Sequence, residues 1–483
     1  MQAVDAGSAE QRGDKASEGP SQRAVRDLPD PPKKYWKYVG PGVVAGGVGL
    51  ASGEFILWPY IASQVGLVLL WGALLGVLTQ FYLNMEVERY TLATGETAVS
   101  GFNRFWKHWG LVFAVLVYFA NLWPGWAVSS ATLATYLFDA GNPSIIAAIG
   151  LLVIGAGLTL APVIYIALER MIFVKVAAMA VLIGLSLAFA IRPVSWEALP
   201  AGVFGIGNIP TGLTVALVFG AIAFAGSGGG QNLCQSNWIR DKGFGMGEFV
   251  PRLVSPITGE EEAVPTARSF TFEPTPENMA RWNGWWKFAN IEQIFSFGLM
   301  TVVTIILMSM LAHSTVFGLP DLPNSVAFLE IEAQQLRMSV GPWFGTLFLA
   351  IGTFALFGSA MGVIDYTSRL AADVLKTTYL TKPTISESRI YFWLVWGMVG
   401  LGCVVLLAGV SQPLTLLVIS ASTGGATMFL YSMLLIALNK KHLPVPIRVR
   451  GFRLGVLVWS SLAFGVLTVV TIYFQLQRLM VGG

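Results

Sequence analysis

The feature that most constrains the fold of this chain is a series of apolar stretches, each about 20 residues long, that recurs from residue 40 to the end. Such a stretch can cross a bilayer as a helix, because a helix satisfies its own backbone hydrogen bonds. Charged residues make up 12% of the 483 residues, compared with about 25% in soluble domains. We therefore predict an all-α integral membrane protein.

The apolar stretches predict about eleven transmembrane helices. The predicted spans are 40–62, 66–88, 109–137, 143–167, 171–191, 212–238, 288–312, 342–366, 390–409, 412–438 and 453–475. Basic residues fall in alternate loops, Arg170 and Lys175 among them. By the positive-inside rule, the N-terminus of this cell-membrane protein is cytoplasmic, and the odd number of spans places the C-terminus outside.

The segments outside the spans read as polar connectors. Residues 1–38 are polar, mixed in charge and without an apolar signal segment, so we expect a disordered cytoplasmic tail before a transmembrane domain at 39–483. Residues 239–287 are expected to form a cytoplasmic loop. The formal net charge of +3 gives no basis for nucleic-acid binding.

Two of the predicted spans are interrupted by glycines. Span 1 contains 46-GGVGLASGE-54, and span 6 contains 225-AGSGGGQNLCQSN-237. Each glycine destabilises a helix by about 1 kcal/mol relative to Ala, and backbone unwound at membrane depth needs protein, water or a solute as partner. Close helix packing is the alternative explanation for the glycines.

The interruptions occupy matching places in two successive groups of five spans. The groups cover about 40–191 and about 212–438, and the helix at about 453–475 is additional. This arrangement favours an inverted repeat with a solute held between the two broken helices, as in secondary transporters. The candidate substrate-binding residues are Ala51, Ser52, Gly53, Glu54, Gly228, Gly229, Gln231 and Asn232.

Glu54 is the strongest individual candidate, because ionisable residues inside spans usually face a cavity or a partner. Its role would be that of a metal-ion ligand or of a proton carrier during transport. The alternative is a structural carboxylate that caps the amides of the broken helix.

Other ionisable residues have mainly structural explanations. Asp365 and Arg369 stand at i, i+4, which predicts an ion pair, with a role in gating or coupling as the alternative. Glu86 and Glu88 are explained by a solvated helix end, and so is Glu292, for which an inner gate is the alternative. The expected interfacial and packing residues are His108, His313, His442, Cys234 and Cys403.

The chain resembles the NRAMP (natural resistance-associated macrophage protein) family of divalent-metal transporters over about residues 40–440. The resemblance is carried by 40-GPGVVAGG-47, by 94-TGETA-98 and by 345-GTLFLAIGTFALFGSAMGVIDYTSRLAADVL-375. It implies the leucine-transporter fold of the APC superfamily, with a 5+5 inverted repeat and broken helices 1 and 6. It also implies metal-ion transport by alternating access, as a proton symporter or a facilitator.

The chain departs from the family at the metal ligands. The family signature Asp-Pro-Gly-Asn aligns with residues 51–54, so Ala51 stands where the family has its metal-binding aspartate. The Met-Pro-His signature aligns with residues 229–231, and Ala421 stands at the family's span-10 glutamine. The remaining ligands are oxygens, which suit a hard cation such as magnesium better than a soft metal.

The sequence therefore predicts an NRAMP-like secondary transporter of a cation, with no cofactor and no enzymatic constellation. Its partners would be the transported cation or solute, the lipid bilayer and, for symport, protons. One alternative is a transporter of a small organic solute such as an amino acid, whose carboxylate could bind a half-helix N-terminus. A second alternative is a transport-inactive receptor or scaffold.

Overall fold

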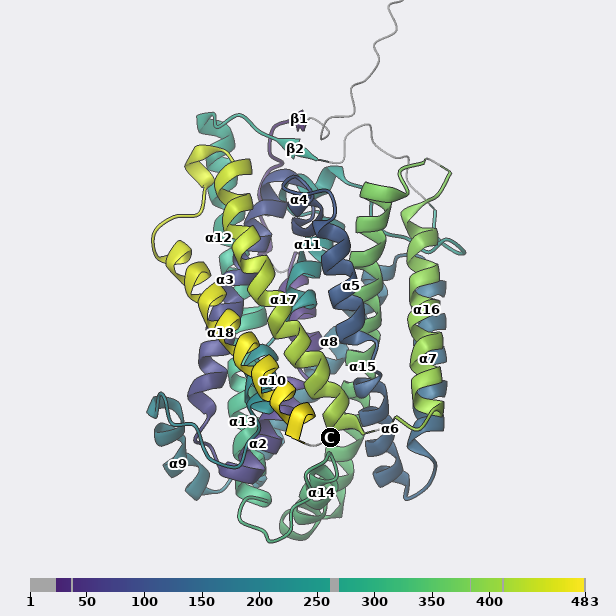
Figure 1. Ribbon diagram of the computed structural model, residues 1–483, viewed down its shortest axis with the longest axis vertical. Helices are drawn as coiled ribbons and strands as arrows, with labels where there is room; N and C mark the ends of the chain where they lie inside the picture. The colour runs from purple at the N-terminus through teal and green to yellow at the C-terminus, as the bar shows by residue number, and fades with distance from the viewer. Residues whose placement is uncertain (1–22, 36–37, 261–268, 383, 411, 482–483) are drawn as a thin grey trace, which may run out of the picture.

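The structure, a computed structural model, is a bundle of helices with one very small sheet (Figure 1). It describes residues 23–35, 38–260, 269–382, 384–410 and 412–481. The helices are α1 (Pro41–Gly49), η2 (Gly53–Leu57), α2 (Trp58–Val65), α3 (Leu70–Thr94), α4 (Ala98–Phe102), α5 (Trp109–Asn121), α6 (Gly125–Phe138), α7 (Pro143–Leu160), α8 (Ile164–Phe189), α9 (Pro193–Phe204), α10 (Val215–Ala223), α11 (Gly230–Lys242), η3 (Gly245–Phe249), α12 (Pro276–Gln293), η4 (Ile294–Leu299), α13 (Met300–Thr315), α14 (Phe328–Ser339), α15 (Pro342–Val374), η5 (Leu375–Tyr379), α16 (Glu387–Leu407), α17 (Pro413–His442), η6 (Val445–Ile447) and α18 (Phe452–Val481).

The two strands mark one end of the bundle. Strand β1 (Ala24–Val25) pairs in parallel with β2 (Phe270–Thr271), and both lie near α4 at the top of Figure 1. We call this end the β end. The opposite end carries α9 and α14, and the chain finishes on that side after α18. The two ends of the described chain thus lie at opposite ends of the bundle.

Nine helices in the described part of the chain are long and apolar enough to cross a membrane. The predicted count of eleven is therefore not confirmed. Predicted span 66–88 corresponds to α3, and predicted span 212–238 corresponds to α10 and α11. None of these three helices is among the nine. α10 and α11 are short, with 9 and 13 residues, because the glycine segment separates them. α3 is continuous but carries several buried polar side chains.

The boundary between predicted spans 4 and 5 was wrong. α7 ends at Leu160 and α8 begins at Ile164, so Arg170 and Lys175 lie inside a helix and not in a loop. Pro162 accounts for the early break, since a proline disfavours helical backbone at the residue before it. Span 3 is also divided, between α5 and α6, next to Pro124.

Residues 23–35 belong to the segment that composition predicts to be a disordered tail, and in the structure they are folded onto the β end. The Leu28 side chain is 1% exposed, and its backbone N–H donates to Asn278 Oδ1 at 3.1 Å. Trp285 Nε1 donates to the Pro29 carbonyl at 2.9 Å. These contacts attach the segment to α12. Residues 1–22 lie outside the described residues.

The predicted loop 239–287 is shorter than expected. α11 continues to Lys242, and α12 begins at Pro276. The intervening segment contributes η3 and β2 to the β end. At the centre of the bundle, α15 has 33 residues and packs against α5, α6, α8 and α16, which makes it the main scaffold helix.

Candidate solute-binding site

Both predicted helix interruptions are present in the structure. Residues 50–52 separate α1 from the π-helical turn η2, and residues 224–229 separate α10 from α11. Gly226, Gly228 and Gly229 have φ values of +115°, +74° and +50°. L side chains rarely adopt that backbone conformation, so the glycines permit the break in span 6.

The two interruptions are in direct contact with each other. A Cβ atom placed on Gly49 would collide with the carbonyl oxygen of Gly226, and one placed on Gly53 would collide with that of Phe224. The glycines of span 1 therefore allow close packing as well as a break, and the two interpretations drawn from the sequence apply together.

Gln80 of α3 satisfies much of the unwound backbone in span 6. Its Nε2 donates to the carbonyls of Ala223 and Ala225 at 3.0 Å and 2.9 Å. Its Oε1 accepts the backbone N–H of Gly228 at 2.8 Å. Gln80 was not among the predicted site residues. A glutamine in the interior of a predicted span is the signal that could have indicated it.

The Glu54 carboxylate lies at the contact between the two interruptions. The residue is fully buried, and neither carboxylate oxygen has a hydrogen-bond partner among the described residues. Its Oε1 lies 3.6 Å from the position of a Cβ on Gly49. The backbone N–H groups of Gly226 and of Glu54 itself act on the carboxylate without meeting hydrogen-bond geometry. The capping role and the ligand role of Glu54 therefore both stay predictions.

A buried lysine faces the same region. Lys175 of α8 is 0% exposed and interacts electrostatically with Glu54. Its Nζ donates to Ser359 Oγ of α15, and that hydroxyl donates to the carbonyl of Val48 near the end of α1. Sequence reasoning missed Lys175, because it was grouped with Arg170 among the basic residues of a loop, although it falls inside the predicted span 171–191.

The other predicted binding residues lie around the interruptions but differ in their contacts. Ala51, Ser52 and Gly53 are buried in span 1. Gln231 donates to the carbonyl of Ala45 in α1, whereas Asn232 Nδ2 donates to Asn84 Oδ1 of α3 at 2.6 Å. The amides of Gln231 and Asn232 thus connect α11 to its neighbours.

Asp365 and Arg369 form the predicted ion pair as part of a larger buried network. Arg369 donates to both oxygens of Asp365 at 3.1 Å and 2.9 Å, and to Asp241 of α11. The network continues through Arg240, which bonds to Asp373 at 2.8 Å and to Glu387 at 3.1 Å. These contacts join α11, α15 and α16, and none of them involves Glu54.

The prediction of solvated positions for Glu86, Glu88 and Glu292 was wrong. Their exposed fractions are 0%, 0% and 4%. Glu86 pairs with Arg89 at 2.7 Å. Glu292 accepts the backbone N–H groups of Gly42 and Gly40 at 2.9 Å and 3.3 Å, and so caps the start of α1. Neighbouring helices cover this end of α3, which a single-sequence pattern does not reveal.

Within the described ranges, no group of three or more His, Cys, Asp and Glu side chains could hold a metal ion. His108 bonds to Tyr379, and His313 bonds to Ser195. Cys234 and Cys403 are free cysteines. A cation at Glu54 would therefore depend on backbone carbonyls, hydroxyls and water for its remaining ligands.

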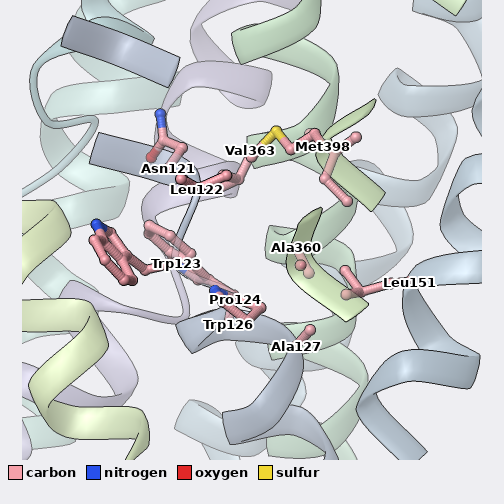
Figure 2. Close-up of a pocket in the computed structure, with 12 residues that line it drawn as sticks. Asn121, Leu122, Trp123, Pro124, Trp126, Ala127, Leu151, Ala360, Val363 and Met398 are labelled. Atoms are coloured by element: carbon pink, nitrogen blue, oxygen red, sulfur yellow. The ribbon is translucent and has the colours of Figure 1, made fainter. Parts of the chain in front are cut away.

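A separate small cavity lies at the division between α5 and α6 (Figure 2). Its volume of about 20 Å³ is on the scale of one water molecule. Asn121, Trp123 and Trp126 line it from one side, and Ala360 and Met398 come from α15 and α16. None of the predicted substrate-binding residues lines this cavity, so we do not assign the solute to it.

The broken helices, the buried scaffold and the apolar spans together define an integral membrane protein with a transporter fold. No family model matches the sequence, and no curated protein matches it. Solved structures of the Eremococcus coleocola manganese transporter match its fold.

Two of these structures, both of single-residue variants, match at a TM-score of 0.67 with 12% identity, and cover 95% of this chain and 91% of theirs. A third, in complex with an aromatic bis-isothiourea substituted compound, has a TM-score of 0.65 and 11% identity, with the same coverage. These NRAMP-like neighbours support the family resemblance at the level of the fold.

Proposed function

We propose that the chain is a secondary transporter that moves a hard divalent cation, such as magnesium, across the cell membrane by alternating access. The observation that carries the proposal is the Glu54 carboxylate, which is fully buried where the two broken helices meet and has no hydrogen-bond partner within the described ranges. A buried carboxylate of this kind is unfavourable unless a cation or a proton accompanies it.

The chemistry of the surroundings favours a hard ion. Ser52 and Ser227 supply hydroxyl oxygens beside the interruptions, and the unwound segments supply carbonyls. Thioether and imidazole ligands are missing from the positions where the family resemblance would place them. Hydrated divalent cations bind through one or two carboxylates and keep several waters, which this donor set allows.

The orientation in the membrane is part of the proposal. The basic residues Arg89, Arg104 and Lys107 flank α4 in sequence, and α4 lies at the β end (Figure 1). The positive-inside rule therefore places the β end in the cytoplasm and the end that carries α14 outside.

Uptake into vesicles tests the role of Glu54. We expect Glu54→Gln to abolish uptake of Mg²⁺ or Mn²⁺ by proteoliposomes, because the amide keeps the shape of the side chain and removes its charge. Glu332→Gln is the matched control, since Glu332 is also 0% exposed but lies in α14, away from the interruptions. Wild-type uptake by a folded Glu54→Gln protein would contradict the proposal.

A pH-sensitive dye inside the same vesicles distinguishes proton symport from facilitated transport. Acidification that follows the metal gradient in the wild type, and is lost in Glu54→Gln, would assign proton coupling. Uptake without acidification would assign facilitation.

One observation favours a small zwitterion, such as an amino acid, as a second candidate substrate. Glu54 and Lys175 place a buried carboxylate and a buried ammonium group in electrostatic contact, and this pair is complementary to an amino group and a carboxylate. A thermal-shift screen of metal salts against amino acids separates the candidates, because a ligand at 100 times its Kd stabilises by about 2.7 kcal/mol. If neither class stabilises or is transported, the receptor or scaffold alternative gains support.

A further inference from the structure

Two buried carboxylates near the β end remain outside the site described above. Glu88 of α3 is 0% exposed, and neither of its oxygens has a hydrogen-bond partner among the described residues. Glu292 of α12 uses Oε1 to cap α1, and its Oε2 is without a partner. The two carboxylates repel each other electrostatically, and α3 packs directly against α12.

The basic residues that act on these carboxylates are bonded to other groups. Arg453 acts on Glu88, but its hydrogen bonds go to Asn290 and Glu86. Lys242 acts on Glu292, but its Nζ bonds to Glu169 at 2.6 Å. In the part of the chain that the structure describes, the basic residues acting on the pair thus form their bonds with other groups.

Buried polar side chains, some of them with atoms that lack a partner among the described residues, continue from this pair toward the broken helix of span 6. Gln80, Asn84 and Glu88 follow each other at i+4 spacing, so they lie on one face of α3. Gln80 binds the unwound segment, and the buried Asn84 Nδ2 has no partner among the residues that the structure describes. On α11, which packs along α3, Gln235 is fully buried, and both of its amide atoms lack partners in the same residues.

We propose that Glu88 and Glu292 form a second cation site, for a hydrated hard divalent cation, between α3 and α12 at the β end. The inference rests on the proposed cation transport and extends it, because it places a second binding position on the same route. Glu292 contacts Gly42, and the helical part of α1 from Gly42 to Gly49 alone spans roughly 10 Å at 1.5 Å per residue. Glu54 lies beyond the end of α1. The two sites are therefore distinct, and a cation passing between them would follow the polar face of α3.

The pair is suited to such a cation for two reasons. Two carboxylates offer hard oxygen ligands and compensate the ion's double charge, whereas the amides of Asn84 and Gln235 can bind the waters that a hydrated ion retains. Glu292 also caps the start of α1, so a cation bound to its carboxylate would lie beside the end of that helix.

Equilibrium binding of Mn²⁺ to the purified full-length chain in detergent tests the inference, with electron paramagnetic resonance used to count the free ion. We expect Glu88→Gln and Glu292→Gln each to lower the number of bound ions by one relative to the wild type. Glu88→Asp, which keeps the charge, should retain the ion. Glu86→Gln is the neighbouring control, because Glu86 is already paired with Arg89.

Thermal unfolding in metal-free buffer gives a second readout. Removing one of two repelling carboxylates should raise the melting temperature of Glu88→Gln and reduce the further rise that Mn²⁺ produces. Wild-type stoichiometry together with an unchanged Mn²⁺-induced shift in both glutamine variants would overturn the inference.

The outcome can be separated from that of the proposed function. If Glu54→Gln binds and transports like the wild type while Glu88→Gln loses one ion, the second site stands and the assignment of Glu54 fails. If Glu54→Gln loses an ion and Glu88→Gln does not, the reverse holds.

Discussion

Replacing Arg369 with methionine should strongly destabilise the protein. The guanidinium group joins Asp365 of its own helix to Asp241 of α11, and all three side chains are 0% exposed. Methionine preserves much of the volume but leaves two buried carboxylates without this cation. Breaking a buried pair by removing one partner typically costs about 3–5 kcal/mol.

Because both carboxylates keep other partners, we expect the loss of unfolding free energy to stay in this range, although two ion pairs are broken. Asp365 retains hydrogen bonds from Tyr391 at 2.9 Å and from Trp238 at 3.3 Å. Asp241 retains Arg240 at 3.7 Å. We therefore expect the Arg369→Met protein to lose about 3–5 kcal/mol of unfolding free energy.

Equilibrium unfolding of the purified protein in mixed detergent micelles measures this difference. Arg170→Met is the control, because Arg170 is exposed on α8 and such surface changes stay within about 0.5 kcal/mol. In an Asp365→Asn background, the same arginine substitution should cost at least about 1 kcal/mol less, since contacting residues couple by that order. A loss of under about 1 kcal/mol in Arg369→Met would refute the reasoning, because a buried pair should cost several times more.

Three further predictions concern burial, packing and charge. Burial raises the pKa of Glu332 in α14 from 4.5 to about 8, so folding favours its protonated form, and this contribution to stability is fully present below about pH 4.5 and lost as the pH rises through 8. In the wild type, the unfolding free energy should therefore fall by at most about 1.4 kcal/mol per pH unit between these two pH values. Glu332→Gln should remove this fall, which unfolding experiments at a series of pH values would measure. Gly53→Ala should prevent close packing against the carbonyl of Phe224 and reduce uptake more than Gly184→Ala, whose added Cβ would meet nothing within 4 Å. Lys175→Met should lower stability by removing the ammonium group that interacts electrostatically with Glu54 and bonds to Ser359, and Lys175→Met combined with Glu54→Gln should recover part of that loss in thermal unfolding.

The sequence predicted the helical membrane class and both interruptions because these depend on local composition. Runs of glycine such as 228–230 disfavour a continuous helix wherever they occur, and the φ values of Gly228 and Gly229 reflect that local preference. Glu54 could be singled out for the same reason, since a carboxylate in an apolar stretch is conspicuous without any tertiary information.

The parts that could not be predicted depend on which helices cover which residues. Glu88 looked like a solvated helix end, but neighbouring helices bury it completely. Lys175 was counted among the basic residues of a loop, and its contact with Ser359 joins residues far apart in sequence. The predicted spans 66–88 and 212–238 are not among the nine helices that are long and apolar enough to cross a membrane in the described part of the chain. The first carries buried polar side chains, and the second is divided into two short helices.

The capping of α1 by Glu292 has a mechanical consequence. α12 holds the start of α1 through Glu292 and also holds residues 28–29 through Asn278 and Trp285. A tilt of α1 that opened the β end would therefore either break its hydrogen bonds to Glu292 or move α12 together with α1. The rate of opening would then depend on contacts made by residues 28–29. Variants that lack residues 1–29 should therefore open at a different rate even with an intact binding site.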